Sequence, residues 1–332
     1  MKLKDALVLD LDATTERLSA ALRDTVHRKL RRRGLVVAIS GGVDSACVAA
    51  LATRAFGPDH VFGLLMPEKD SNPESTVLGR RLVETLGIDY HVQDIGQLLS
   101  ASGCYAARDA AVRSAYPPYT PADCWKIVMR GDRLAQNLLT VYDLVVQPAD
   151  GRPQERVRLT AQAYLQIVAA TNFKQRCRKM IEYYHADRLV YAVGGTPNRL
   201  EYDQGFFVKL GDGAADVKPI ASLYKTQTYA LARHLGVIDE ILEREPTTDT
   251  FSLEQSQTEF FFSAHHSELD LILWAKNHQR PAVEVSRELG VSTERVERVY
   301  NDIDQRRRTT AYLHAAPQLL EAVPEIAPLG IG

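Results

Sequence analysis

Strand-like and helix-like patterns alternate through the first hundred residues of the chain. Residues 35–39 and 61–66 are apolar runs of strand length, and 90–95 is a third predicted strand. Continuous apolar runs rich in β-branched residues are typical of strands buried on both faces of a parallel sheet. The intervening segments 46–54 and 71–86 have helical composition and length. This order predicts parallel strands with right-handed crossovers, an α/β fold with a doubly wound parallel sheet flanked by helices.

Capping and turn residues mark where the helices begin and end. A helix is predicted over 13–33, because its apolar residues recur every four positions and would line one face. These residues are Leu18, Leu22, Val26 and Leu30. The helix of 71–86 begins with Ser-Asn-Pro-Glu, which combines a cap, an early proline and a Glu three residues after the Ser. Gly87 is expected to end it.

The segment from about residue 97 to residue 158 is the least regular part of the chain. It contains the loop signal Tyr-Pro-Pro-Tyr-Thr-Pro at 116–121. Residues 143–147 and 156–159 flank a Pro-Ala-Asp-Gly-Arg-Pro turn and predict a short β-hairpin. We interpret 97–158 as an insert within the α/β domain.

Regular patterns return after the insert. A helix is predicted over 160–185 and a fourth strand over 189–193. The next segment, 205–216, is dense in glycine, acidic and aromatic residues and lacks strand or helix periodicity, which is typical of a functional loop. A helix over 226–235 follows, and Gly236 is expected to end it.

Residues 267–315 have a helical pattern that allows two interpretations. The helix of 282–289, the turn Gly-Val-Ser and the helix of 293–303 resemble a DNA-binding helix-turn-helix. The second helix, however, carries Glu294 and Glu297 beside its arginines and offers no clean basic face to phosphates. The sequence therefore favours a packed helical hairpin.

Composition narrows the class of protein. The 332 residues are 45% hydrophobic and 25% charged, with a net charge of −2 and a pI of about 6.5. This balance is typical of a soluble globular protein and gives no sign of a nucleic-acid partner. No apolar run is long enough to span a bilayer, and the charged residues among the first twelve predict that there is no signal peptide. Four scattered cysteines argue for a reducing cytoplasm and against a disulfide framework or a zinc site.

The most specific signal is the loop Ser-Gly-Gly-Val-Asp-Ser at 40–45, directly after the first strand. Glycines let the backbone turn sharply and approach a ligand, and free N–H groups at a helix N-terminus bind anions. Ser40 and Ser45 add hydroxyl donors, and Asp44 can hold a metal that bridges phosphate oxygens. The loop lacks the Gly-Lys-Ser/Thr of the Walker sequence and resembles the pyrophosphate loop of the N-type ATP pyrophosphatases.

Several separated motifs together resemble the NAD synthetase family, of the ammonia-dependent type. They occur in the family's order and cover most of 30–260, and more loosely the helices to about 310. The motifs are Ser40 to Ser45, Asn172 to Arg176, Gly195-Thr196 with Glu201, Phe206 to Asp216, Leu223 to Thr226, and Pro246-Thr247. The resemblance implies an adenine nucleotide alpha hydrolase-like fold. It divides the chain into an ATP pyrophosphatase-type α/β domain at 1–265, containing the insert, and a C-terminal helical extension at 266–332 packed on the same domain.

The resemblance also implies a reaction and a set of site residues. ATP adenylates the carboxylate of deamido-NAD (nicotinic acid adenine dinucleotide), and ammonia then displaces AMP to give NAD. The implied ATP contacts are Ser40, Gly41, Gly42, Val43, Asp44, Ser45, Arg176, Thr196, Lys225 and Thr247. The implied substrate contacts are Phe206, Phe207, Lys209, Asp212 and Asp216. Asp44 and Glu201 match the magnesium ligands, and Asp44, Arg176 and Lys225 are the expected catalytic residues.

The sequence departs from the family pattern in four places. It lacks the glutaminase domain of larger members, which implies free ammonia or an ammonia-donating partner. The insert is longer than usual, Gln255 to Phe262 replaces an acidic pair, and Arg306 to Arg308 replaces a His-Lys-Arg run. Two alternatives therefore stay open: an adenylating amidoligase acting on another carboxylate, and a nucleotide sensor without turnover. A homodimer without nucleic-acid or membrane partners is expected.

Overall fold

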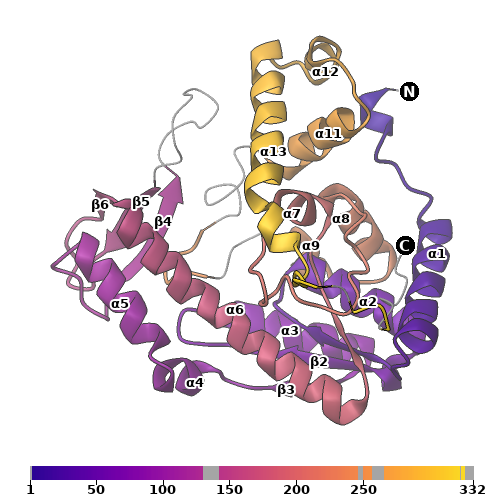
Figure 1. Ribbon diagram of the computed structural model, residues 1–332, viewed down its shortest axis with the longest axis horizontal. Coiled ribbons are helices and arrows are strands. Elements are labelled where there is room, and N and C mark those ends of the chain that lie inside the picture. Colours follow the sequence, from indigo (N-terminus) through magenta and orange to yellow (C-terminus); the bar gives the residue numbers. More distant parts are fainter. Residues whose placement is uncertain (1, 130–141, 246–249, 256–264, 322, 326–332) are drawn as a thin grey trace.

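A four-stranded parallel sheet forms the centre of the protein (Figure 1). The computed structural model describes residues 2–129, 142–245, 250–255, 265–321 and 323–325. The strand order is β3-β2-β1-β7, and each neighbouring pair is parallel. The strands are β1 (Leu35–Ala38), β2 (Val61–Leu65), β3 (Asp89–Val92) and β7 (Ala192–Gly194). The predicted strands are therefore present, although β3 ends before Asp94 and β7 begins three residues later than expected.

Helices cover both faces of this sheet, as the doubly wound prediction requires. Leu35 and Val37 of β1 belong to one buried apolar cluster, whereas Val36 between them belongs to a second. The first cluster contains residues of α1 (Leu11–Arg23), α2 (Val43–Phe56), α3 (Pro73–Leu86), α8 (Lys225–His234) and α9 (Asp239–Glu243). The second contains residues of α4 (Gly96–Ala101), α5 (Cys104–Ala115) and α6 (Ala161–Leu189). Period-two alternation along β1 thus divides its side chains between two cores.

Local signals locate most helix ends, with a few differences. Asn72, not Ser71, caps α3 by accepting a hydrogen bond from the backbone N–H of Glu74, and Gly87 ends the helix in the left-handed region at φ 67°. The predicted N-terminal helix continues from α1 into a π-helical segment, Asp24–Lys29. Short 3-10 turns occupy Leu3–Asp5 and Pro58–His60.

The insert contains a second, antiparallel sheet in the order β4-β5-β6. Its strands are β4 (Cys124–Met129), β5 (Tyr142–Gln147) and β6 (Glu155–Arg158). The predicted hairpin is confirmed as β5 and β6. The sequence analysis did not predict β4, which pairs with β5. Trp125, Leu144 and Val146 pack with α5 and the start of α6 in a separate core. Figure 1 shows α6 running from this sheet, at the left, to the parallel sheet.

The predicted helix of 160–185 is α6, which is 29 residues long and is capped by the Thr160 hydroxyl. It continues to Leu189, so this residue ends a helix and does not begin a strand. Val190 follows with φ 58°, a left-handed conformation that turns the chain toward β7.

The C-terminal helices pack above the α/β unit (Figure 1). They are α11 (His266–Asn277), α12 (Ala282–Leu289) and α13 (Thr293–His314). With α7 (Arg199–Gln204) they form one apolar cluster, and α12 packs directly on α13, as the favoured hairpin interpretation expects. No helix in the described part of the chain is long and apolar enough to cross a membrane.

Candidate active site

The loop at 40–45 lies at the carboxyl end of β1, where the strand order reverses between β1 and β7. Ligands bind at such switch points in open α/β sheets. The loop is held by its own side chains: the Ser45 hydroxyl donates to the Gly42 carbonyl oxygen at 3.0 Å and accepts from the backbone N–H of Ser40 at 3.2 Å. Gly41 has φ 77°, and a Cβ there would lie 2.5 Å from the Ser75 carbonyl oxygen. Only glycine fits this position without strain.

Lys225 and a second carboxylate, Glu201, lie near Asp44 of this loop. The Lys225 ammonium group is buried and forms an ion pair with Asp44. Asn198 links the two carboxylates, because its side-chain amide donates to Asp44 at 3.0 Å and its backbone N–H donates to Glu201 at 3.2 Å. Burial opposes the charge on Lys225, but Asp44 and Glu201 more than offset this and raise its pKa above the usual range. A cation and two acidic groups thus converge at one end of the loop.

A cavity of about 780 Å³ opens over these residues and extends to the insert. Most of the predicted site residues line it: Ser40, Gly42, Val43, Asp44, Ser45, Arg176, Thr196, Glu201, Phe206, Phe207, Lys209, Asp212 and Lys225. Gly41 and Asp216 do not line it, and Thr247 lies outside the described residues. Asp94, which follows β3, lines a separate depression beside that strand.

Segment 206–216 is the loop that its composition predicts, but several of its side chains hold the protein together. The Asp216 carboxylate accepts hydrogen bonds from the backbone N–H of Val193 at 2.7 Å and from the Tyr183 hydroxyl at 3.2 Å. The Lys209 ammonium donates to the carbonyl oxygens of Tyr312 and Ala315, at the end of α13. These contacts anchor the segment to β7, α6 and α13.

Asp212 and the two phenylalanines shape the cavity wall. Asp212 is half-buried and accepts from the backbone N–H of Val208 at 2.8 Å, and desolvation of its carboxyl group raises its pKa. The Phe207 ring stacks on Tyr202 with centroids 6.2 Å apart, while Phe206 packs against the C-terminal helical cluster. A Cβ at Gly213 would lie 2.2 Å from the Phe207 ring, so this glycine leaves room for the ring.

The structure also brings residues to the cavity that the sequence analysis did not select. Lys179 and Glu182 form a buried ion pair at 2.7 Å on α6, and both line the cavity. Tyr142 from the insert stacks on Tyr164 of α6, with centroids 4.4 Å apart, at the opposite end. Asn198 has a signal that could have revealed it: an Asn three residues before Glu201 is a capping pattern, which is present at the start of α7.

Comparison with known proteins shows the family to which the chain belongs. The NAD synthase family model matches residues 14–114 and 134–311. The NH(3)-dependent NAD(+) synthetase of Rhizobium meliloti (strain 1021) is 53% identical over 322 residues, covering 97% of this chain and 96% of that protein. The chain belongs to the NAD synthase family. The NH(3)-dependent NAD(+) synthetase of Thermotoga maritima is more distant, at 35% identity over 73% of this chain and 79% of its own length.

Solved structures of NAD synthases and a related enzyme share the fold. NH3-dependent NAD synthetase from Campylobacter jejuni has a TM-score of 0.62 at 22% identity, covering 95% of this chain and all of that one. NMN synthetase from Francisella tularensis has a TM-score of 0.64 at 20% identity, covering 94% of this chain and 99% of that one. At these identities the likeness establishes the architecture, and the predicted α/β fold is confirmed.

Two departures from the NAD synthase pattern have structural roles here. The Gln255 amide donates to the Ile127 carbonyl oxygen at 2.6 Å and so ties its segment to β4. Arg307 forms a bidentate contact with Asp203 at 2.6 and 2.7 Å, which joins α13 to α7. The residues between the two parts of the family match, 115–133, include β4.

Proposed function

We propose that this protein is an NH3-dependent NAD synthetase, which adenylates the carboxylate of deamido-NAD with ATP and transfers ammonia to the activated carbonyl. The observation that carries the proposal is the convergence of loop 40–45, Lys225, Asp44 and Glu201 at the switch point of the sheet. The names of relatives that match nearly the whole chain support the choice of substrate. The predicted ligase activity is thus the one that the relatives' names describe.

The first step joins the substrate carboxylate to the α-phosphorus of ATP and releases pyrophosphate. Catalysis of such a step consists largely of positioning and charge stabilisation. The leaving pyrophosphate would be bound by the backbone N–H groups at the start of α2 and by the hydroxyls of Ser40 and Ser45. The Lys225 ammonium, held charged by its neighbours, offsets the negative charge that develops on the phosphates. Arg176 lines the same cavity and is the second cation assigned to the nucleotide.

In the second step ammonia attacks the acyl-adenylate, AMP leaves, and a proton is released. Asp212 lies in the cavity wall with a raised pKa, which suits a group that takes up this proton. Phe206 and Phe207 are the flat surfaces available to a pyridine ring, and Lys209 and Asp216 stabilise the segment that carries them.

Asp44 and Glu201 fit the proposed magnesium site. Hard cations prefer carboxylate oxygens, and Mg²⁺ in nucleotide sites is held by one or two carboxylates together with phosphate oxygens. Both carboxylates line the cavity and contact the same Asn198, so they face one region beside the phosphate loop. When bound, the ion would neutralise charge on the phosphates.

A direct assay tests this proposal. Purified protein with ATP, Mg²⁺, ammonium and deamido-NAD is expected to form NAD, AMP and pyrophosphate in equal amounts. A panel of other carboxylates, including the acid form of NMN, is expected to release little pyrophosphate. Release with another acid only would favour the alternative amidoligase. If Asp44→Ala leaves AMP formation unchanged, the proposed catalytic site is wrong.

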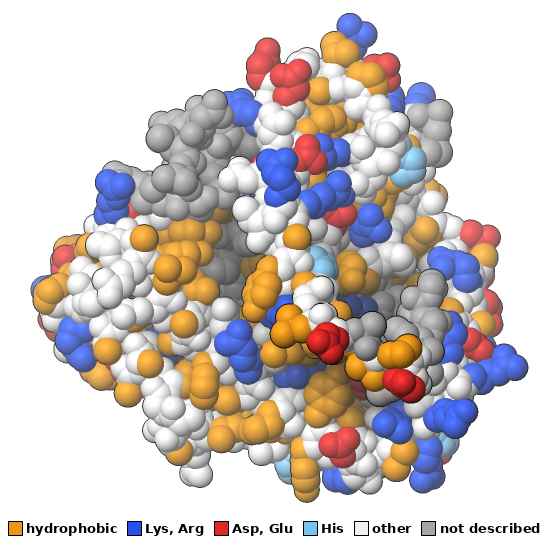
Figure 2. All heavy atoms as spheres, in the orientation of Figure 1, with side chains coloured by type: hydrophobic (Ala, Val, Ile, Leu, Met, Phe, Trp, Pro, Cys, Tyr) orange, Lys and Arg blue, Asp and Glu red, His pale blue; other side chains and the backbone are white. Residues whose placement is uncertain are grey.

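A homodimer is the proposed oligomeric state. Three apolar side chains of α6 are more than half exposed: Leu165 at 63%, Met180 at 58% and Tyr184 at 63%. Figure 2 shows hydrophobic side chains along the course that α6 takes in Figure 1. Such exposed apolar surface is a frequent mark of an interface. Light scattering is expected to give twice the chain mass, and Met180→Glu is expected to shift it toward the monomer.

A further inference from the structure

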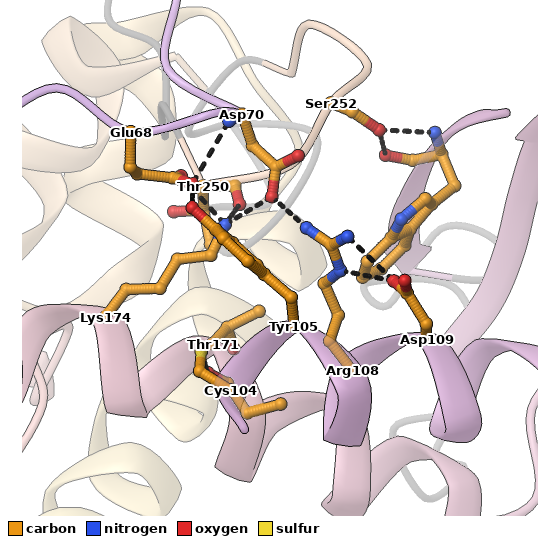
Figure 3. A network of polar contacts seen from close by, with 12 residues as sticks. Glu68, Asp70, Cys104, Tyr105, Arg108, Asp109, Thr171, Lys174, Thr250 and Ser252 are labelled. Atoms are coloured by element: carbon orange, nitrogen blue, oxygen red, sulfur yellow. Dashed lines mark hydrogen bonds and ion pairs between the residues drawn. The ribbon is translucent and has the colours of Figure 1, made fainter. Parts of the chain in front are cut away.

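A buried network of charged side chains connects the insert to two segments of the cavity wall (Figure 3). Its members come from the loop after β2, from α5 of the insert, from α6 and from the segment that begins at Thr250. They are Glu68, Asp70, Tyr105, Arg108, Asp109, Lys174 and Thr250. None of the residues in the proposed reaction belongs to this network, so its role needs a separate explanation.

Lys174 is the centre of the network. Its ammonium donates to Glu68 at 2.9 Å, to Asp70 at 2.5 Å and to the Thr250 carbonyl oxygen at 3.2 Å. Its side chain is only 2% exposed, and those of its two acidic partners are 0% and 4% exposed. A buried ammonium group is stable only when its hydrogen-bonding capacity is used, and these three acceptors use it fully.

Arg108 extends the network into the insert. Its guanidinium, also 2% exposed, contacts Asp70 at 2.5 Å and Asp109 at 2.7 Å. Asp109 in turn accepts from the Tyr119 hydroxyl at 3.0 Å. Asp70 therefore bridges a cation of α6 and a cation of α5, and the loop after β2 is attached to both helices.

The two attached segments line the substrate cavity. Ser71 and Thr250 both contribute to its wall. The Ser71 hydroxyl accepts from the backbone N–H of Glu68 at 3.1 Å, so the position of Ser71 depends on the network. Displacing these wall segments would change the shape of the cavity and weaken substrate binding, since a ligand pocket works largely as a preformed shape.

The segment after Thr250 is attached to the insert sheet along its length. The backbone N–H of Leu253 donates to the Trp125 carbonyl oxygen at 3.1 Å, and the backbone N–H of Trp125 donates to the Ser252 hydroxyl at 2.8 Å. The rings of Trp125 and Phe251 pack 5.2 Å apart. Figure 3 shows Ser252 and its contacts to the right of the network.

We propose that Lys174 and Arg108 are positioning residues for the reaction, and that the insert is the support to which they fix the cavity wall. The inference rests on the proposed function only in naming the substrates, since the cavity and its wall are independent of them. Through Asp70 and Thr250, the two cations set the distance between the loop after β2 and the segment 250–255. The insert thereby contributes to substrate binding without placing a charged group in the site.

Kinetics of paired variants test this role. In Lys174→Met and Arg108→Met we expect the KM for ATP or deamido-NAD to rise at least tenfold, with kcat changing less than threefold. Lys276→Met is the matched control, because Lys276 forms a 2.8 Å pair with Asp304 on the C-terminal helices, outside the cavity wall. Its KM values are expected to stay within twofold of the parent.

A double variant separates positioning from stability. Lys174→Met with Asp70→Asn removes one positive and one negative charge, so it is expected to recover much of the melting temperature lost in Lys174→Met while the raised KM persists. If the double variant has parental KM values, the network serves stability alone and the proposal is overturned. Ser252→Ala is a milder change that keeps the network intact, and a KM rise of about threefold is expected.

Binding of ATP alone keeps this test distinct from that of the proposed function. Calorimetry is expected to show at least tenfold weaker ATP binding, or unchanged ATP binding with weaker deamido-NAD binding, in Lys174→Met. If the parent protein binds both nucleotides but does not amidate deamido-NAD, the proposed function fails while the two binding measurements still decide the role of Lys174. Equal binding of both nucleotides by Lys174→Met and the parent would overturn the positioning role.

Discussion

The phosphate loop and the segment 206–216 are both dense in polar residues, yet they use them differently. In the loop at 40–45, side chains hold the turn and leave backbone N–H groups and Asp44 directed at the cavity. In 206–216, Lys209 and Asp216 are engaged with α13, α6 and β7. One region presents its polar groups to the cavity, and the other uses them to support the cavity wall.

This difference shows that motif density does not by itself identify ligand contacts. Six contiguous residues suffice to build an anion site, because backbone geometry does most of the binding. A wall that fits a dinucleotide must be supported from several elements, so many of its polar residues face the protein. Variants of matched chemistry in the two regions are therefore expected to behave differently.

Of the variants considered, Lys225→Met is expected to have the largest effect, which is a loss of kcat. It removes a buried cation from beside the phosphate loop, and loss of one such stabilising group typically lowers kcat by about 10²–10³-fold. AMP formation by the purified variant measures this. Lys209→Met is the counterpart in the other region and is expected to retain most of kcat. Equal losses in the two variants would contradict the comparison.

The next largest effects are expected on substrate binding when either of two glycines is replaced by alanine. Gly41→Ala places a side chain at φ 77° and against the Ser75 carbonyl oxygen, so strain of about 1–2 kcal/mol or more should weaken ATP binding. Gly213→Ala instead displaces the Phe207 ring and should raise the KM for deamido-NAD with little change for ATP. Titrating ATP and deamido-NAD separately shows whether each variant affects only one of the two substrates. A loss of ATP binding in Gly213→Ala would show that the two regions are not separable.

The free energy of unfolding is expected to depend on pH through Asp270, which contacts the start of α8. Its carboxylate accepts from the backbone N–H of Thr226 at the start of α8, and burial raises its pKa to about 6. The native state then holds this proton more tightly than the unfolded chain, so the stabilisation is present below about pH 4 and is lost as the pH rises through 6.

Asp270→Asn isolates this effect. Between pH 4 and pH 7 the free energy of unfolding of the parent, relative to the variant, should fall by up to ~3 kcal/mol. Urea denaturation at several pH values measures the difference. A difference independent of pH would mean that Asp270 titrates normally.

The smallest expected effect is the loss of stability in Lys209→Met. The ammonium satisfies two carbonyl groups at the end of α13 from a partly exposed position, so its loss should lower the free energy of unfolding by about 1 kcal/mol. Thermal denaturation measures this. Lys209→Arg, which keeps the charge and can still donate, is expected to lose less. An unchanged melting temperature together with a raised KM would assign Lys209 to the substrate instead.

Sequence analysis located much of this architecture. The four parallel strands, the end of α3 at Gly87 and the hairpin of β5 and β6 rest on signals that lie within a few residues of one another. The predictions were wrong where contacts between residues far apart in the chain determine the structure. The end of α6 extends past His185, and β4 forms in a segment outside the family match, because each is packed by residues far away in the chain.

The sequence by itself determined the strand–loop–helix of the phosphate site, since a glycine turn and a helix N-terminus are local structures that need no distant partner. The tertiary structure alone decided which polar residues face the cavity. Lys209 reaches a carbonyl 103 residues away, and Lys174 reaches a carboxylate 106 residues away. Whether a charged side chain binds substrate or another part of the chain depends on what packing places within hydrogen-bond distance, and no local pattern records that.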